Sequence, residues 1–382
     1  MRLEFPRQEF EHRLAAARAL LDESGLEGLL LTAEANINYF TGYRHFCPWT
    51  TFTRPAVLLI PKKAEPVLLV QGFLRADAAR DCWFPDVRGY KTLLGLPVEQ
   101  TAELFREHDM AAGQVGAELG YEQRLGLAYN DFVSLQSALP KVQLTDAAGL
   151  LWQLRIRKSA LEIDATRRSG QIAAKAFADV WAHAHEGSTE QDVAEILARR
   201  IGEEGGEVGF RIITSGSGDY DRTAGQARQR VLNKGDMLWI DLGVIYNGYW
   251  TDHCRAGVVG GPSDEQRKNW DLVVQVTRKG IDAIAPGVKI AEIVRACEDE
   301  ARSNGLEFSF AAGRMGHGMG LMSTEPPHVA SYDQTVLDEG MMITVEPGWV
   351  EPHGTYVSEE NLAVTSSGAD FMTVTPRDLK TI

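Results

Sequence analysis

Cysteine is scarce in this sequence and shows no paired spacing. The chain has 382 residues and four cysteines, Cys47, Cys82, Cys254 and Cys297, none of which belongs to a Cys-x-x-Cys motif. Folds that depend on disulfides are short and use cysteine densely. The scarcity therefore argues against a disulfide framework, and we expect free thiols in a reducing, cytoplasmic compartment.

Long apolar runs and an excess of basic residues are missing as well. No run approaches the roughly 20 apolar residues that span a bilayer. The first residues, MRLEFPRQEFEHRL, lack the continuous apolar core of a secretory signal. The formal net charge of −14 opposes binding to nucleic acid, whose phosphates attract basic surfaces. We therefore expect neither a membrane nor a nucleic acid as a partner.

The first part of the chain has the pattern of an α/β domain. Residues 7–23 carry apolar side chains at helical spacing. Three runs follow, GLLLT, PAVLLIP and PVLLVQ, which are bounded by Pro and Gly as buried strands are. Residues 36–50, NINYFTGYRHFCPWT, mix aromatic and polar side chains, and we expect a functional or interface loop there. The change from apolar to charged residues in LLWQLRIRKSALEID predicts a boundary near residue 155, and hence domains 1–155 and 156–382.

The second domain combines helices and strands. Ser188 precedes Gln191 by three residues, and Ser263 precedes Gln266 by the same distance, which is the spacing of a helix-capping box. A further amphipathic pattern predicts a helix over 289–303, and strand patterns dominate after it. We therefore predict an α+β domain.

The segment 241–252, DLGVIYNGYWTD, predicts a β-hairpin with an aspartate at each end. The Asn-Gly pair at 247–248 favours a two-residue type I′ turn. That turn would pair Gly243 with Asp252, and Asp241 with Cys254. Because side chains alternate between the two faces of a strand, both carboxylates then lie on one face as diagonal neighbours. The hairpin gathers negative charge at one place.

Three later residues could join these aspartates: His317 in GRMGHGMGL, Glu346 in MMITVEPGWV and Glu359 in TYVSEENLAVT. Four ionised carboxylates ~5–6 Å apart would repel by on the order of 10–20 kcal/mol, whereas a domain is stable by only ~5–15 kcal/mol. Either several of them are protonated or cations lie between them. The donor set suits two divalent ions such as Mn, Co, Fe or Zn. A single strand aspartate is more often a cap or a salt-bridge partner, so the residues alone leave the convergence open.

Seven short motifs together resemble one known family. NINYFTGY lies in the first domain, LRIRKSALEI at the junction, and WIDLG, TDHCR, GHGMGL, TVEPG and SEENLAVT follow in the second. In this order they resemble the creatinase/prolidase family of pita-bread metallohydrolases, which includes aminopeptidase P, and the resemblance spans nearly the whole chain. It implies a creatinase-like N-terminal domain over 1–155, a pita-bread catalytic domain over 156–382, and a homodimer.

The resemblance also implies the roles of site residues. Aligning ENLAVT with the family's closing strand makes Glu359, rather than its neighbour Glu360, the final metal ligand. Glu346 would in addition accept a proton beside the bridging hydroxide. The implied ligands of two divalent ions are Asp241, Asp252, His317, Glu346 and Glu359.

Three positions depart from the family's peptidases. The region that carries a histidine before the first ligand reads DYDRTAG here, Thr324 stands in place of a second histidine, and Val357 in place of an arginine. Those groups stabilise the tetrahedral intermediate or hold the substrate, and Thr324 is a weaker, neutral donor. We therefore expect a metal-dependent hydrolase that cleaves an amide-type C–N bond in a small substrate, a non-peptide compound or a modified amino acid.

Several alternatives remain open. Tyr220, His328 and Tyr332 are candidates for lining the substrate pocket, and His328 or Tyr220 could replace the missing groups in an Xaa-Pro dipeptidase or aminopeptidase. A lyase of small sulfonium or betaine compounds is another activity for this fold, and a catalytically silent scaffold is disfavoured because all five ligands are present. The aromatic stretch 43–49, with Arg54 nearby, leads us to expect that the first domain helps to close the partner's site in the homodimer.

Overall fold

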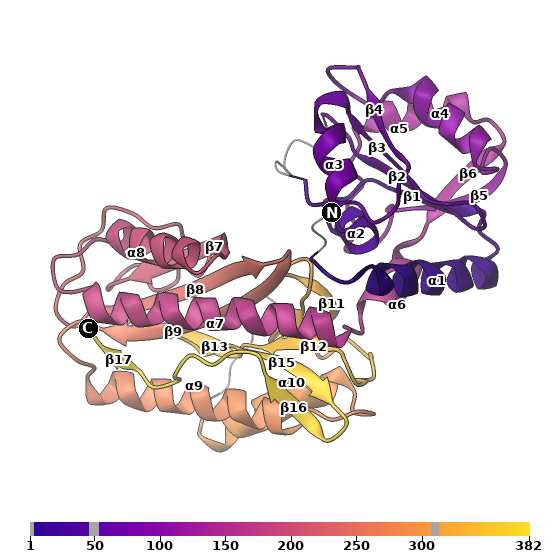
Figure 1. Cartoon of the computed structure of the whole chain (residues 1–382). Coiled ribbons are helices and arrows are strands. Elements are labelled where there is room, and N and C mark those ends of the chain that lie inside the picture. The colour runs from indigo at the N-terminus through magenta and orange to yellow at the C-terminus, as the bar shows by residue number, and fades with distance from the viewer. Residues whose placement is uncertain (1–3, 46–52, 307–312) are drawn as a thin grey trace. The chain divides into compact units, whose positions relative to one another are not determined.

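The structure is a computed structural model that describes residues 4–45, 53–306 and 313–382 (Figure 1). The chain divides into two compact units, Met1–Arg155 and Ile156–Ile382. Within the described residues, no helix is both long and apolar enough to cross a bilayer. Cys82, Cys254 and Cys297 are buried free thiols, and Cys47 lies outside the described residues.

Unit 1 is built on a six-stranded mixed sheet with the strand order β4-β3-β2-β1-β5-β6. The strand β2 is antiparallel to both of its neighbours, β1 and β3, and all three lie inside the sheet, where every one of their residues is buried. Such continuous burial explains why their sequences are apolar throughout instead of alternating. The predicted α/β class of this unit is confirmed, with these elements: α1 Arg7–Ser24, β1 Gly28–Leu31, α2 Glu34–Thr41, β2 Val57–Pro61, β3 Val67–Gln71, α3 Arg75–Asp81, β4 Val87–Tyr90, α4 Val98–Glu107, β5 Gly113–Ala117, α5 Tyr129–Ala138, β6 Val142–Asp146 and α6 Ala148–Arg155.

The predicted loop over 36–50 is wrong in its first part, because Glu34–Thr41 forms the helix α2. The start of this helix is held by Glu118, a residue remote in sequence. Its buried carboxylate accepts hydrogen bonds from the backbone N–H of Thr32 at 2.7 Å and from the Asn36 side chain at 2.7 Å. Residues 46–50 of the predicted loop lie outside the described residues.

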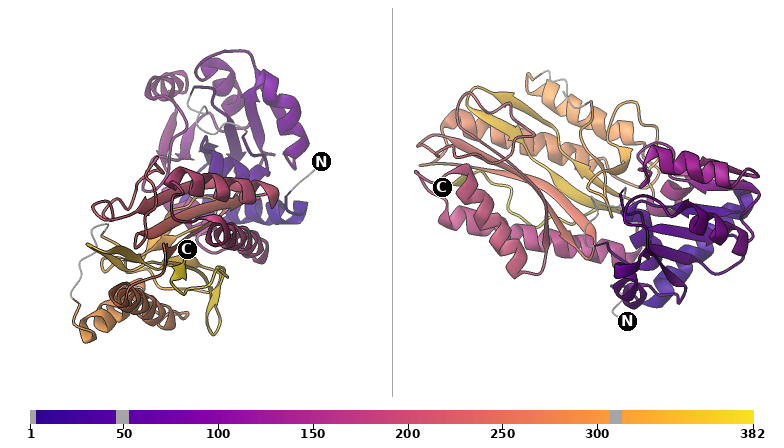
Figure 2. Two further views of the ribbon diagram at one scale, coloured as in Figure 1. Left: turned by 90° about the vertical axis from the view of Figure 1, so that its left-hand side faces the viewer. Right: turned by 90° about the horizontal axis from the view of Figure 1, so that it is seen from above.

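Unit 2 contains two larger sheets, with the orders β17-β9-β8-β7 and β11-β10-β12-β15-β16, and a two-stranded pair, β13-β14. Figures 1 and 2 show α7 and α9 on opposite sides of these strands. Its elements are α7 Ala160–His183, α8 Glu190–Glu203, β7 Glu207–Ser215, β8 Met237–Tyr246, β9 Tyr249–Val258, α9 Asp264–Asp282, α10 Ile290–Ser303, β10 His317–Gly318, β11 Glu325–His328, β12 Met342–Val345, β13 Gly348–Glu351, β14 Gly354–Val357, β15 Glu360–Thr365, β16 Gly368–Phe371 and β17 Lys380–Thr381.

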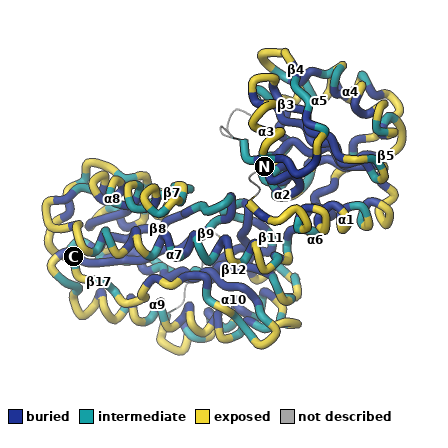
Figure 3. The backbone as a smooth tube through the Cα atoms, in the orientation of Figure 1, coloured by how far each residue is buried: buried dark blue, intermediate teal, exposed yellow. Residues whose placement is uncertain are grey.

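Each larger sheet of unit 2 packs one face against a helix pair. Ile240 and Leu242 of β8 belong to the apolar cluster formed with α7 and α8, and Ile343 and Val345 of β12 belong to the cluster formed with α9 and α10. In Figure 3 these strands are mostly dark blue, whereas yellow, exposed residues lie on the outer sides of the helices. Because side chains alternate along a strand, Asp241 points away from α7 and α8.

Capping boxes begin three helices of unit 2. The predicted box at Ser263 and Gln266 is confirmed at the start of α9. The predicted box at Ser188 and Gln191 is wrong by one residue, because Thr189 caps α8 and Asp192 completes the box. Two adjacent hydroxyl residues make either register plausible from the sequence. Ser159 and Glu162 form a third box, which starts α7.

Candidate metal centre

The aspartates are brought together by the predicted hairpin. β8 and β9 pair Gly243 with Asp252 and Asp241 with Cys254, which confirms the predicted register. Positive φ angles of 50° at Asn247 and 84° at Gly248 agree with the type I′ turn. A tight two-residue turn fixes the register of both strands, and the register places both aspartates on one face.

His317 approaches this face from β10. Its Nε2 lies 3.7 Å from an Asp252 carboxylate oxygen and 3.6 Å from a Glu346 carboxylate oxygen. Its Nδ1 lies 2.9 Å from the carbonyl oxygen of Gly318. The Nδ1–H therefore donates to the backbone, and the lone pair of Nε2 faces the carboxylates, as in a metal-ligating histidine.

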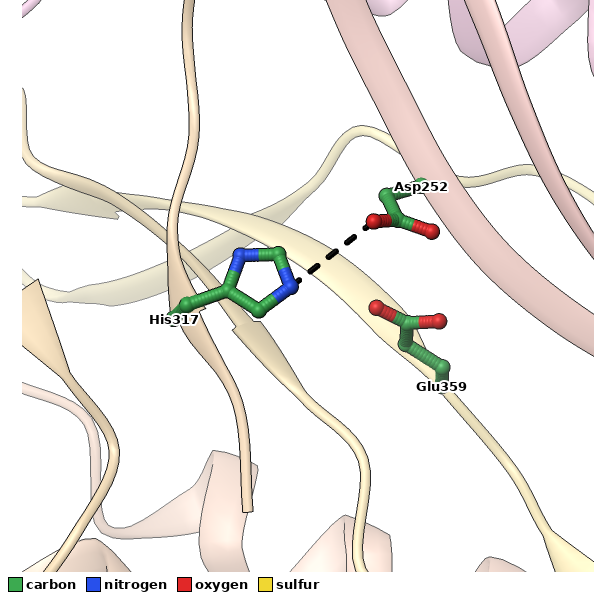
Figure 4. Close-up of side chains that lie close together, drawn as sticks. All are labelled: Asp252, His317 and Glu359. Carbon is green, nitrogen blue, oxygen red and sulfur yellow. Dashed lines mark ion pairs between the residues drawn. The ribbon is translucent and has the colours of Figure 1, made fainter. Parts of the chain in front are cut away.

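Asp252, His317 and Glu359 form a group that could hold a metal ion. One ligand atom from each lies within 4.8 Å of the others, and Figure 4 shows the three side chains pointing toward one another. Buried oxygens of Asp241, Asp252 and Glu359 make no hydrogen bond within the described structure. Such orphaned oxygens are costly unless another group satisfies them. The residues fit a divalent cation with oxygen and nitrogen ligands.

The protonation of the cluster is strongly perturbed when no cation is bound. Burial raises the pKa of Asp241 to about 6 and, together with the charge of Asp241, that of Glu346 to about 8. Burial, followed by the neighbouring carboxylates, raises the pKa values of Asp252 and Glu359 well above their ordinary range. Burial lowers the pKa of His317 to about 4. A bound cation would reverse these shifts for the carboxylates, since it stabilises their charged forms.

Glu359 and Glu360 have different environments. Glu359 is 1% exposed and faces the cluster. Glu360 accepts a hydrogen bond from the buried Arg255 at 2.8 Å and others from Thr373 and Arg377. Its charge is therefore compensated by guanidinium groups, whereas that of Glu359 is left for another partner.

Arg255 also anchors the backbone around the cluster. Its guanidinium donates to the carbonyl oxygens of Cys254 and Glu359, both at 2.8 Å. It donates further to the carbonyls of Thr375 at 2.9 Å and Pro376 at 3.0 Å. One buried side chain thus joins β9, the residue before β15 and the segment after β16.

The candidate pocket residues lie in three different environments. Thr324 and His328 are linked by Arg314, whose Nη1 lies 2.9 Å from His328 Nδ1 and whose Nη2 lies 3.5 Å from Thr324 Oγ1. Tyr220 is buried in an apolar cluster, and its hydroxyl accepts the backbone N–H of Met237 at 3.0 Å. Tyr332, by contrast, is 66% exposed.

Arg314 was not singled out in the sequence. Nothing in GRMGHGMGL marks this arginine except its place three residues before His317. The pairing of β10 with β11 places His328 beside Arg314.

Known proteins match this chain along nearly its whole length. Residues 164–366 match metallopeptidase family M24, and residues 13–157 match the creatinase/prolidase N-terminal domain. The chain belongs to metallopeptidase family M24. The family resemblance and the pita-bread architecture predicted from the motifs are confirmed. Membership makes this M24 protein a metal-dependent hydrolase.

Three relatives of this M24 chain illustrate the likeness. A probable dipeptidase PepE of Mycobacterium bovis is 30% identical, over 98% of this chain and 97% of its own. An Xaa-Pro dipeptidase of Pyrococcus furiosus is 27% identical, over 97% of this chain and 99% of its own. The solved structure of an Xaa-Pro dipeptidase from Bacillus anthracis superposes with a TM-score of 0.84, at 26% identity over 98% of this chain and all of that one.

Proposed function

We propose that this protein is a dinuclear metal-dependent dipeptidase, and that Xaa-Pro dipeptides are the first substrates to test. One observation carries the proposal. A buried cluster of ligand side chains with unsatisfied oxygens lies in a chain that matches dipeptidases along nearly its whole length. Asp252, His317 and Glu359 would bind one divalent ion, and Asp241 and Glu346 would supply the additional ligands that a second ion needs.

Divalent ions bound there, such as manganese, cobalt, iron or zinc, would polarise the amide carbonyl and acidify a water molecule. Glu346 is suited to move the proton. Its side chain is 23% exposed, whereas that of Glu359 is 1% exposed, so Glu346 can reach a substrate while Glu359 stays enclosed. Glu346 would accept a proton from the attacking water and return it to the leaving amine. The Thr324 hydroxyl, beside Arg314, would donate a hydrogen bond near the reacting carbonyl.

The test is turnover by metal-loaded protein on a panel of amides. The panel holds Ala-Pro, Gly-Pro and Ala-Leu, together with N-acetyl amino acids, cyclic amides and creatine. We expect dipeptides to be hydrolysed at on the order of 10 per second with the best metal, and Glu359→Gln to abolish turnover. Glu339→Gln, which changes an exposed acid, is the matched control. Absence of dipeptide hydrolysis with each of the four metals would refute the proposal.

A second candidate is the hydrolysis of a small non-peptide amide. It is favoured by Thr324 and Val357, which stand where the family's peptidases carry a histidine and an arginine, and by the lack of histidine in DYDRTAG. Loss of one oxyanion donor commonly slows an enzyme by ~100–1000-fold. Turnover of a cyclic amide or of creatine that exceeds turnover of every dipeptide would favour this candidate.

A further inference from the structure

Arg314 is held at the edge of the metal cluster by backbone bonds on both sides of its neighbour. The N–H of Met315 donates to the carbonyl of Val329 at 2.7 Å, and the carbonyl of Met315 accepts the N–H of Glu346 at 2.9 Å. The first bond fixes the segment beside β11, and the second fixes it beside a metal-ligand candidate. The same backbone hydrogen bonds therefore fix the main chain next to Arg314 and position Glu346.

The guanidinium of Arg314 has neutral partners. Nη1 lies 2.9 Å from Nδ1 of His328, and a donor at that distance requires His328 Nδ1 to be an acceptor. Nη2 lies 3.5 Å from the Thr324 hydroxyl, which is a long contact. Within the described parts of the chain, Arg314 forms no ion pair with a carboxylate, whereas Arg255 pairs with Glu360 and Arg200 pairs with Asp179.

The charge of Arg314 nevertheless affects the pKa values of residues in the metal-ligand cluster. Burial raises the pKa values of Glu346 and Asp252, and the positive charge of Arg314 opposes that rise; at His317 burial lowers the pKa and the charge of Arg314 adds to the decrease. The guanidinium therefore lies near enough to these side chains to influence their charge. Once divalent ions balance the charge of the carboxylates, Arg314 keeps a positive charge with no counterion among the residues that the structure describes.

An arginine in this situation suits one kind of ligand group. Its planar fork of N–H donors matches a carboxylate, to which it can give two parallel hydrogen bonds. His328 holds one edge of the fork, so the guanidinium is oriented before a ligand arrives, which limits the loss of side-chain entropy on binding. The partner that would balance both its charge and its donors is an anion with two coplanar oxygens.

We propose that Arg314, positioned by His328, binds the free carboxylate of the substrate and thereby restricts the enzyme to dipeptides and similar N-acyl amino acids. This proposal rests on the proposed amide hydrolysis at the same site. A longer peptide has an amide where the dipeptide has its carboxylate, so it offers no charge to Arg314. Arg314 would thus determine the length of the peptide that is cleaved.

The experiment compares one scissile bond with and without the carboxylate. Wild-type, Arg314→Gln, Arg314→Lys and the control Arg302→Gln, an exposed arginine of α10, are loaded with the same metal and assayed on a dipeptide and on its C-terminal amide. We expect Arg314→Gln to raise KM for the dipeptide on the order of 10–100-fold, the value of one charged hydrogen-bond pair, and to change KM for the amide less than threefold. The KM of Arg314→Lys for the dipeptide should lie between those of the wild type and Arg314→Gln, because lysine keeps the positive charge but lacks the planar pair of N–H donors.

Two results would overturn the role of Arg314. Equal losses on the dipeptide and its amide would mean that the arginine acts on the reacting carbonyl or on the fold, and no loss on either would mean that it does not contact the substrate. Metal content and melting temperature of each variant report on folding. If wild-type protein hydrolyses no dipeptide, the proposed function has failed, and calorimetric binding of N-acetylproline and of its amide decides the role of Arg314 separately. The role is refuted if the acid binds no better than the amide, or if Arg314→Gln preserves the difference.

Discussion

Glu359 and Glu360 are adjacent in sequence, yet one carboxylate faces the metal-ligand cluster and the other is paired with the buried Arg255 at 2.8 Å. The side-chain alternation of an extended backbone separates them. Two residues of the same type therefore have different physical tasks, and substitutions can tell them apart.

Glutamine at each position should give opposite results. Glu359→Gln should lose most of the bound metal and keep its melting temperature in chelator, because a buried, uncompensated carboxylate is removed. Glu360→Gln leaves Arg255 buried with one anion fewer, and breaking a buried pair costs about 3–5 kcal/mol. Metal content by mass spectrometry and thermal unfolding in chelator measure both effects, with Glu339→Gln as the exposed control. The same result for both variants would contradict the assignment.

Metal-free protein should become less stable as the pH rises from 6.5 to 8.5. Burial raises the pKa of Glu346 to about 8, so the folded state binds a proton that the unfolded state has already released. The unfolding free energy then decreases with rising pH until the folded-state pKa has been passed. His317, whose pKa is lowered to about 4, affects stability mainly below its ordinary value of about 6.5.

Melting curves in EDTA across this pH range test the effect. Glu346→Gln should flatten the dependence, and so should saturation with Mn²⁺, since the cation stabilises the ionised carboxylates. A melting temperature of the EDTA-treated protein that rises between pH 6.5 and 8.5 would speak against a bare, buried carboxylate cluster.

Gly243 tests the packing beside the aspartate pair. A Cβ atom at this position would lie 2.6 Å from the ring of Phe210 on β7 and 3.1 Å from the Trp250 ring. Overpacking of this kind commonly costs about 1–3 kcal/mol, so Gly243→Ala should lower the melting temperature. Gly149→Ala, where a Cβ meets no atom within 4 Å, is the matched control. Equal stability of the two variants would show that the Phe210 ring can move aside.

We expect the protein to be a homodimer in solution. The exposed large hydrophobic side chains of unit 1 include Phe73, Leu93 and Leu94, and the Gln71 side chain donates to the backbone carbonyls of Thr92 and Leu93. Exposed apolar patches often mark protein interfaces. Light scattering should give twice the mass of the chain, and Leu93→Asp with Leu94→Asp should shift it toward the monomer. A wild-type monomer at working concentration would exclude the dimer.

The hairpin shows what the sequence can predict well. A two-residue Asn-Gly turn fixes the register, and strand alternation then decides that Asp241 and Asp252 share a face. Both rules are local, so no knowledge of the rest of the chain was needed. The seven short motifs indicate the family for a similar reason, since five of them each place one candidate ligand in a short recognisable context.

Features that depend on remote residues escaped the sequence analysis. The residues of helix α2 predict a loop because their aromatic and polar side chains show no clear period, whereas the carboxylate that holds the start of the helix comes from the remote Glu118. No sequence motif marks Arg314, because it contacts His328 only through the pairing of β10 with β11. The sequence does not distinguish Ser188 from Thr189 as the cap of α8, because both offer a hydroxyl at the start of the helix.

The contacts of Arg255 link the metal centre to residues far along the chain. Its guanidinium donates to the carbonyl of Glu359 and to those of Thr375 and Pro376, while Thr373 donates to Glu360. Proteolytic trimming back to residue 372 would remove no ligand, but it would leave Arg255 with two fewer acceptors and Glu360 with fewer donors. The protein would then lose metal because the residues that support the ligands, and not the ligands themselves, had lost their hydrogen-bond partners. An affinity tag on this protein is therefore better placed at the amino end.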